Sequence, residues 1–476
     1  MRKSEQLLDR IRSGQPMTFG ERLRLIVLLS IPAILAQVSL TAMFYIDAAM
    51  VGSLGPEASA SVGLVETTTW LFGGLCSAAA TAFSVQVAHR LGASDKEGAR
   101  AVVRQGTVAV VIFGAVIALL GLAISPFLPQ WLGGNDDINR NSSFYFAIFT
   151  AFLPVYTLNS LAGGVLRCSG NMNTPSALNI LMCVLDVVFN FFLIFPSHEF
   201  SLAGAEIRLP GAGLGVAGAA IGTGLAEVIT ALLMNYVLWR RSPQIDMRSS
   251  GSFALNRSVI RRAFKIGAPI GLQQCVMSGA HIMSTVIVAP LGTIAIAANS
   301  FAITAESLCY MPGYGVSEAA TTIVGQCVGA KRRRLTRELA YLCVGIGMAV
   351  MAIMGAVMWF GADAMIGMMT PSGEIRGLGA SVLRIEAFAE PMFAAAIVSY
   401  GIFVGAGDTL VPSCMNFGSI WLVRLTLAAL LVGSMGLTGV WIAMAVELSF
   451  RGFIFLLRLR SSAWLRHPSA AEQPTD

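Results

Sequence analysis

The sequence predicts an all-α integral membrane protein with twelve transmembrane helices, arranged as two pseudo-symmetric lobes of six helices each. Two observations carry this prediction. The 476 residues are 55% hydrophobic and only 12% charged, whereas soluble proteins have about 25% charged residues. The chain also repeats its pattern of prolines and glycines at a fixed spacing, so its two halves are expected to share one shape.

Apolar segments long enough to cross a bilayer occur twelve times along the chain. The expected spans are 24–51, 60–86, 101–127, 143–166, 176–196, 213–238, 265–290, 295–326, 339–361, 381–405, 413–434 and 437–458. They divide the chain into a leader (1–23), a first lobe (24–238), a linker (239–264), a second lobe (265–458) and a tail (459–476). The leader lacks the short apolar core and cleavage site of a signal peptide.

Basic residues gather in the loops that follow even-numbered spans. Examples are Arg90, Lys96 and Arg100 after the second span, and the run from Lys331 to Arg334 after the eighth. Short loops rich in Lys and Arg stay in the cytoplasm, so we expect a multi-pass protein of the cytoplasmic (inner) membrane with both termini inside. The net charge of +6 is explained by these loops and does not indicate a nucleic-acid partner.

The second half repeats the first at an offset of 237 residues. The register holds for about 150 residues and ends at the longer loop SHEFSLAGAEIRLPGAG. Matching pairs are Pro32 and Pro269, Gln37 and Gln274, Gly55 and Gly292, Gly92 and Gly329, Pro154 and Pro391, Gly164 and Gly401, Gly170 and Gly407, Pro175 and Pro412, and Asn179 and Asn416. Six helices per half give both halves one orientation in the membrane. Such parallel repeats are typical of transporters whose halves rock around a central site.

Each polar residue inside a span of the first half can be compared with the residue aligned to it in the second half. Asp47, Asp186 and Asn190 align with Ser284, Val423 and Leu427 in the second half, so the shared architecture does not require them. Asp186 and Asn190 are four residues apart and Asn179 is seven residues earlier, which places the three on one face of the fifth span. Lipid cannot satisfy such groups, so this face should contact protein or a water-filled cavity.

Other polar pairs lie at helical spacing in the fourth and sixth spans. Tyr156 and Asn159 are three residues apart, and Thr223 and Glu227 are four apart. Together with the first and fifth spans, these helices would enclose one polar pocket. A carboxylate there could hold and exchange a proton or another cation, whereas the alternative is a structural hydrogen bond between helices. Candidate cavity-lining residues are Tyr156, Asn159, Asn179, Glu227, Gln274 and Glu306.

Several motifs in both halves resemble the multidrug and toxic compound extrusion (MATE) family. They are DAAMVGSLG at the end of the first span, VAHRLGAS and VGQCVGAK after spans two and eight, VLRCSGNMNTP and VGAGDTLVP after spans four and ten, and GVAGAAIGTG opening the sixth. The resemblance covers about residues 25–460. It implies a V-shaped, two-lobed antiporter that exports cationic or amphipathic compounds in exchange for sodium or protons by alternating access.

The resemblance also assigns residues. The family's first-span acid matches Asp47, its fifth-span polar pattern matches Asp186 and Asn190, and its sixth-span threonine matches Thr223. These four form the expected cation or proton coupling site, with Na⁺ as a candidate ion at Asp47, Asp186 and Asn190. The seventh-span acid of some members is missing from LQQCVMSGAH, which favours coupling in the first lobe. We expect a monomer in contact with membrane lipids.

Other function classes fit less well. A lipid-linked saccharide flippase of the same superfamily is the nearest alternative, but binding a pyrophosphate head requires basic groups in the cavity. The chain has no HExxH motif, no supported G-x-S-x-G motif and no P-loop, so neither an intramembrane enzyme nor an ATP-driven pump is expected. Most of the eight cysteines lie in apolar segments without CxxC spacing, and no cofactor is expected.

Overall fold

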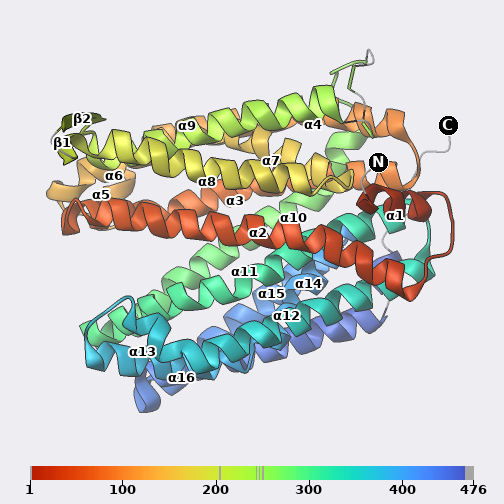
Figure 1. The fold of residues 1–476 in the computed structure, drawn as a ribbon. Coiled ribbons are helices and arrows are strands. Elements are labelled where there is room, and N and C mark those ends of the chain that lie inside the picture. The colour runs from red at the N-terminus through yellow and green to blue at the C-terminus, as the bar shows by residue number, and fades with distance from the viewer. Residues whose placement is uncertain are drawn as a thin grey trace.

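The computed structural model describes residues 3–202, 205–242, 244–245, 247–248, 251–461 and 463–466. Its helices form two lobes that meet at one end and diverge toward the other, which gives the V shape in Figure 1. The short helix α1 (Lys3–Arg12) lies where the lobes meet. The hairpin of β1 (Pro196–Leu202) and β2 (Ala205–Ala212) lies at the opposite end of the first lobe. We call these ends the α1 end and the hairpin end.

The first lobe contains spans one to six. The fourth span is a pair of helices, α6 and α7, bent by 45° at the break between them. The elements are α2 (Phe19–Gly52), α3 (Pro56–Gly92), α4 (Lys96–Ile124), α5 (Leu128–Trp131), α6 (Asp136–Ala151), α7 (Leu153–Cys168), α8 (Asn173–Ile194), the β-hairpin, α9 (Gly215–Tyr236) and the π-helical turn η1 (Val237–Arg241).

The second lobe repeats this arrangement, including a fourth span that is bent by 59° between α13 and α14. The elements are α10 (Arg257–Val288), η2 (Ala289–Leu291), α11 (Thr293–Gly329), α12 (Arg333–Gly367), α13 (Gly373–Ala387), α14 (Glu390–Ala406), α15 (Leu410–Gly418), η3 (Ser419–Arg424), α16 (Leu425–Ser461) and η4 (Ala463–Arg466).

The helices account for the twelve predicted spans. In the described part of the chain, nine helical segments are long and apolar enough to cross a membrane, and the two bent pairs add two more spans. The 52-residue segment Leu410–Ser461 is broken at Gly436, whose φ is 57°. This segment therefore supplies the eleventh and twelfth spans, and the predicted fold class is confirmed.

Unusual backbone angles recur at the same offset as the sequence repeat. Positive φ values occur at Gly55 and Gly292 (122° and 92°), at Ser94 and Lys331 (61° and 57°), and at Gly170 and Gly407 (95° and 84°). Positive φ is uncommon for residues other than glycine, so its presence at both Ser94 and Lys331 is a specific structural match. The turns of the two halves therefore have the same conformation.

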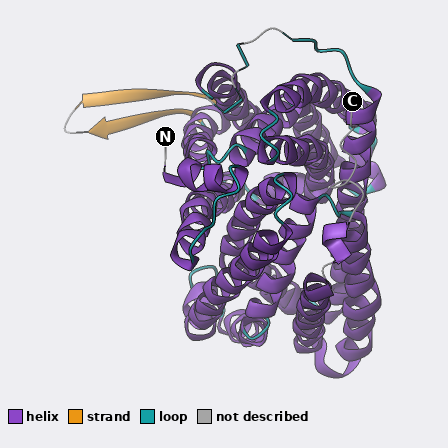
Figure 2. Ribbon diagram, turned by 90° about the vertical axis from the view of Figure 1, so that its right-hand side faces the viewer, coloured by secondary structure: helices purple, strands orange, loops and turns teal. Residues whose placement is uncertain are grey.

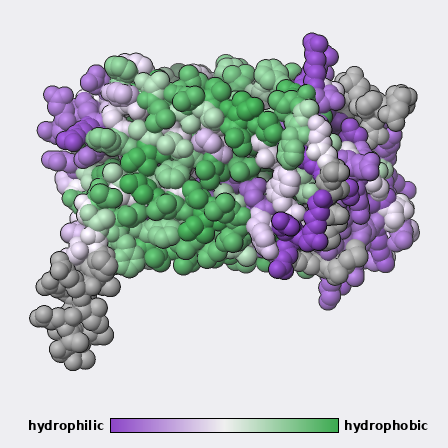
Figure 3. Space-filling model, turned by 90° about the horizontal axis from the view of Figure 1, so that it is seen from above, coloured by the Kyte–Doolittle hydropathy of each residue, from purple (hydrophilic) through white to green (hydrophobic). Residues whose placement is uncertain are grey.

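The surface has the distribution of a membrane protein. Figure 3 shows a broad hydrophobic band across the middle of the molecule, with hydrophilic side chains gathered at its two ends. Hydrophobic side chains are stable in the hydrocarbon core of a bilayer, and polar ones at its interfaces. On the face in view, the band therefore marks the part of the molecule that lies in the membrane.

The hairpin differs from the sequence expectation, which treated this segment as a loop. β1 and β2 are antiparallel, with Phe200 opposite Ile207, and Figure 2 shows them extending away from the helices. EFSL and EIRL alternate polar and apolar residues, which is the period-two pattern of strands. The fold thus carries one small hairpin on an otherwise helical framework.

Several helices extend beyond their predicted spans because their first turns are polar. α2 begins at Phe19, where Thr18 caps the helix: Thr18 Oγ1 accepts from the Glu21 amide, and Glu21 Oε2 accepts from the Thr18 amide. α10 begins at Arg257, inside the predicted linker, where Asn256 Oδ1 caps the helix by accepting from the Ser258 amide at 2.9 Å. Apolar windows locate the membrane-buried part of a helix but not these ends.

The two lobes are closely packed at the α1 end, where α3 crosses α11. A side chain at Gly92 would place its Cβ 2.1 Å from the carbonyl oxygen of Gln326, and one at Gly329 would place it 2.1 Å from that of His89. These two contacts are related by the internal repeat. α2 packs on α11, and α3 packs on α10, so each lobe is joined to the other by equivalent helices.

Candidate functional site

The predicted acidic residues of the first lobe meet between α2 and α8. Asn190 Nδ2 donates to Asp47 Oδ1 at 2.8 Å and to Asp186 Oδ2 at 3.1 Å. Asp186 and Asn190 are fully buried and Asp47 is half-buried. Both hydrogens of one amide group are thus directed at two carboxylates that also face each other.

Local sequence brings these groups together. Asp186 and Asn190 lie one turn apart on α8 and therefore project from the same face. α9 packs tightly beside them because Gly222 has no side chain: a Cβ there would lie 2.0 Å from Asn190 Oδ1. The next residue, Thr223, lies beside Asp186, and its hydroxyl donates to the Ala219 carbonyl at 3.1 Å. All four predicted coupling residues are therefore adjacent.

The hydrogen bonding of this cluster is incomplete. Asp186 Oδ1 and Asn190 Oδ1 are buried, and neither has a hydrogen-bond partner among the described residues. Two carboxylates in a buried site repel each other unless a proton or cation lies between them, and an unpaired buried oxygen is costly. These oxygen donors suit a proton or a hard cation such as sodium. No group of three or more His, Cys, Asp or Glu residues suited to a metal ion occurs in the described part of the chain.

Glu227 belongs to a neighbouring cluster rather than to the Asp47 site. Asn159 Nδ2 of α7 donates to Glu227 Oε1 of α9 at 2.7 Å, and both residues are buried. Tyr156 lies close enough to Glu227 to sense its charge. Thr223 and Glu227 are one turn apart, so α9 contributes to both clusters.

The remaining predicted residues are dispersed. Asn179 is half-buried on α8, about 10 Å along the helix from Asp186. Gln274 lies in the contact between α10 and α3, where its side chain packs against Gly74. Glu306 is buried inside the second lobe. None of the three belongs to the Asp47 cluster.

The second lobe has a buried acidic cluster that the sequence analysis missed. Glu386 and Glu390 lie on either side of the break between α13 and α14. Both side chains are fully buried, and none of their four carboxylate oxygens has a partner among the described residues. Glu306 lies near both of them. Both acids lie inside the predicted span 381–405, and this feature of the sequence could have identified them as candidate functional residues.

The interior of the two lobes contains further polar groups. Tyr145 of α6 lies near Asp47 and Asp186, and no sequence motif had singled it out. On α16, Arg451 Nε binds Glu447 Oε1 at 3.1 Å, and Ser419 donates to the same oxygen at 2.5 Å. The Glu447 carboxylate is thereby satisfied, in contrast to those of Glu386 and Glu390.

Twelve spans in two parallel six-helix repeats, with buried carboxylates between the helices, define a membrane transporter. The family model MatE matches residues 32–192 and 269–430, one match in each half. These matches cover more than half of the chain, which therefore belongs to the MatE family. The matched segments correspond to the two lobes.

Individual relatives match along most of the chain. The probable multidrug resistance protein NorM of Pseudomonas aeruginosa is 27% identical over 441 residues, which cover 89% of this chain and 86% of that protein. The protein of the same name from Thermotoga maritima is 23% identical over 423 residues, covering 88% of both chains.

Two solved structures share the fold. The first is an outward-facing conformation of a multidrug resistance MATE family transporter of the MOP superfamily, with a TM-score of 0.86, 23% identity and coverage of 99% of this chain and 100% of that one. The second is a MOP superfamily transporter from Pyrococcus furiosus, whose description reports a binding pocket of reverse polarity that suggests a different function. Its TM-score is 0.85 at 22% identity, with coverage of 99% and 100%.

Proposed function

We propose that this protein is a secondary active multidrug efflux antiporter. It exports cationic or amphipathic compounds in exchange for protons or sodium ions, and it works by alternating access. The names of its relatives support the multidrug cargo. The observation that carries the ion-coupling proposal is the shared amide donor of Asn190, which serves two adjacent carboxylates and leaves Asp186 Oδ1 buried without a partner among the described residues.

The proposed coupling follows from charge. Two like charges 4 Å apart repel by about 4 kcal/mol at an effective dielectric constant of 20. A proton or sodium ion between Asp47 and Asp186 removes this repulsion and draws α2 and α8 together. A cationic drug competes for the same carboxylates when the ion has left, but it is too large to lie between them and keeps α2 and α8 apart. Ion and drug therefore favour different states of the first lobe, which is the condition for coupling.

The proposed orientation places the α1 end in the cytoplasm. The basic loops between α3 and α4 and between α11 and α12 both lie at this end of the helices, and basic loops remain inside. The lobes meet at this end and diverge at the hairpin end (Figure 1), so the conformation is outward-facing. The protein acts in the inner membrane as a monomer, and membrane lipids surround it.

A lipid-linked saccharide flippase is the second candidate, because the same fold occurs in a transporter described as having a different function. Such a cargo carries a pyrophosphate, which basic side chains would bind. The buried atoms without a hydrogen-bond partner in the described lobes include Asp186 Oδ1 and all four carboxylate oxygens of Glu386 and Glu390. This favours a cationic cargo.

Reconstitution tests the proposal. Purified protein in liposomes would be loaded with ethidium, and efflux would be driven separately by a sodium gradient and by a pH gradient. We expect one gradient to drive efflux and Asp47→Asn to abolish it. Asp137→Asn makes the same chemical change at an exposed residue of α6 and should leave efflux unchanged. If neither gradient moves a cationic dye, the multidrug proposal fails and a lipid-linked saccharide becomes the cargo to test.

A further inference from the structure

The helix α1 lies across the junction of the two lobes although it belongs to neither repeat. Leu8 and Ile11 are fully buried on its inner face. Leu8 packs against Gly170 at the end of α7, where any larger residue would collide with the Leu8 methyl group. On the second-lobe side, Arg332 donates to the Arg10 carbonyl at 3.1 Å and to the Gln15 carbonyl at 2.8 Å.

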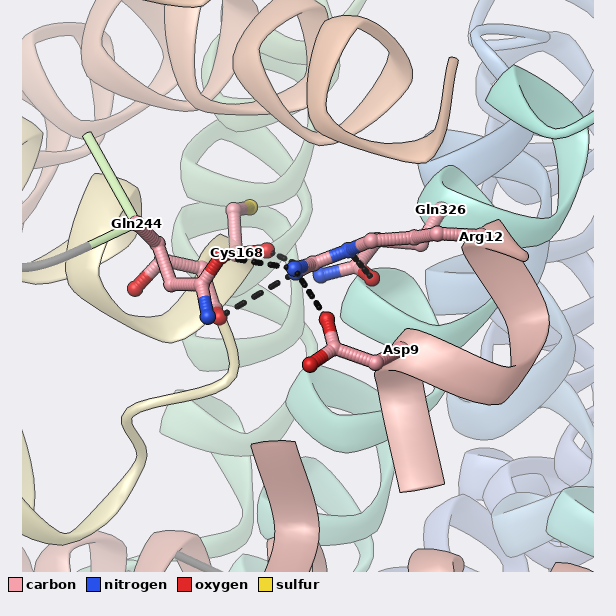
Figure 4. Close-up of polar contacts among 6 residues, drawn as sticks. Asp9, Arg12, Cys168, Gln244 and Gln326 are labelled. Atoms are coloured by element: carbon pink, nitrogen blue, oxygen red, sulfur yellow. Dashed lines mark hydrogen bonds and ion pairs between the residues drawn. The ribbon is translucent and has the colours of Figure 1, made fainter. Parts of the chain in front are cut away.

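Arg12 at the end of α1 joins both lobes and the linker (Figure 4). Its guanidinium donates to Gln326 Oε1 of α11 at 3.1 Å, to the Ser169 carbonyl of the first lobe at 3.4 Å, and to Gln244 Oε1 of the linker at 2.8 Å. The Arg12 side chain is 9% exposed. Burial lowers its pKa, and the ion pair with Asp9 at 3.0 Å opposes that shift.

The internal repeat relates two hydrogen bonds that join the lobes near α1. Gln326 Nε2 donates to the Cys168 carbonyl at 2.6 Å, and this bond joins α11 to the end of α7. The equivalent bond 237 residues away joins His89 Nε2 of α3 to the Gly405 carbonyl of α14 at 2.7 Å. The two bonds are thus related by the internal symmetry, and both cross between the lobes.

An arginine supports each of these bonds, but the two arginines come from different places. Arg262 donates to His89 Nδ1 at 2.9 Å, and it lies on α10 inside the second repeat. Leu25 occupies the equivalent position in the first repeat and cannot donate. Arg12 therefore supplies from α1 the hydrogen bonds that the first repeat lacks.

We propose that α1 is a latch that holds the α1 ends of the two lobes together and must release before they separate. This inference rests on the alternating-access function proposed above. Separation of α11 from α7 breaks the hydrogen bond between Gln326 and the Cys168 carbonyl. Arg12 cannot then keep its hydrogen bonds to both Gln326 and Ser169. The latch stabilises the conformation that is open at the hairpin end.

The test measures separation of the lobes at the α1 end directly. Lys96 and Arg333 are exposed, begin α4 and α12, and are 237 residues apart. Both would be replaced by cysteine and spin-labelled, after the exposed Cys275 and Cys414 are changed to serine. Pulsed electron paramagnetic resonance on the full chain in lipid nanodiscs then gives the populations of short and long distances.

Arg12→Ala should raise the ratio of long to short distances about tenfold, because charged hydrogen bonds to Arg12 are lost. Arg12→Gln should act in the same direction, and provides a second variant in case the first does not fold. Arg10→Ala is the matched control, because in the described part of the chain that side chain pairs with Glu21 of α2 and with no residue of the second lobe. It should leave the ratio unchanged.

The outcomes separate the latch from the proposed function. If the parent shows both distances and responds to pH or sodium, but both Arg12 variants match it, the latch is refuted and antiport is unaffected. If Arg10→Ala shifts the ratio as much as Arg12→Ala, the specific role of Arg12 is refuted. If no variant and no ionic condition produces a second distance, alternating access fails, and the latch fails with it.

Discussion

Asp47 of α2 and Asp186 of α8 accept hydrogen bonds from the same nitrogen, Asn190 Nδ2, at 2.8 Å and 3.1 Å. One neutral amide thus serves two carboxylates that approach each other from different helices. When both acids are ionised they repel each other, which favours a proton or a cation between them. The proposed coupling mechanism depends on this relationship.

Removing the shared donor should uncouple the two acids. Asn190→Leu preserves the branched heavy-atom skeleton of the side chain but leaves Asp47 and Asp186 without their common partner, and gradient-driven ethidium efflux should fall about tenfold or more. Asn235→Leu makes the same change on α9, where the amide donates to the Ala231 carbonyl of its own helix, and should retain efflux. Equal losses in both variants would contradict the assigned role of Asn190.

Gly222 should be sensitive to a single added methyl group. A Cβ there lies 2.0 Å from Asn190 Oδ1, so Gly222→Ala should displace the Asn190 amide and reduce efflux. Gly345 on α12 has no atom within 4 Å of the corresponding position. Gly345→Ala should therefore keep efflux and raise stability by up to about 1 kcal/mol. Normal efflux by Gly222→Ala would show that the close approach of α9 is not required.

Glu227 should act as a structural partner of Asn159 and not as a coupling group. Glu227→Gln retains an oxygen that accepts from Asn159 Nδ2, so efflux should persist at near the parent rate. Glu227→Leu leaves the Asn159 amide unpaired and should reduce stability by about 1–3 kcal/mol in thermal unfolding. Loss of coupling in Glu227→Gln, with a normal unfolding temperature, would assign Glu227 to the ion pathway.

The buried ion pair of α16 should contribute strongly to stability when only one partner is removed. Arg451→Met leaves Glu447 charged and fully buried and should cost about 3–5 kcal/mol. Arg384→Met breaks the ion pair between Arg384 and Asp363, in which the two side chains are 36% and 48% exposed. This change should lower the free energy of unfolding by about 1 kcal/mol or less. Comparable changes in unfolding temperature for the two variants would contradict this difference.

The framework of the protein was predictable from sequence because its signals are strong and repeated. Twelve apolar windows give the spans, and the matched prolines and glycines give the two lobes. The residues Asp47, Asp186, Asn190 and Thr223 were predicted to act together, and the structure brings them together. Comparison with the second half was decisive, because it showed which polar groups the architecture does not require.

Other features depend on tertiary contacts that periodicity does not reveal. α1 was expected only as part of a leader, because its ten residues are too short and too polar to resemble a span. Its position is fixed by Leu8, Ile11 and Arg12, whose partners lie far away in the chain. Glu386 and Glu390 were overlooked because the helix break between them, and the complete burial of both, appear only in three dimensions.

The most direct test of the central claim is equilibrium competition between drug and ion at the Asp47 site. Ethidium affinity of the purified protein would be measured by fluorescence across pH and sodium concentration, for the parent and for Asp47→Asn. The account predicts that one of the two ions weakens ethidium binding to the parent and has no effect on the variant. If both proteins respond equally to both ions, coupling does not pass through Asp47, and the proposed mechanism is wrong.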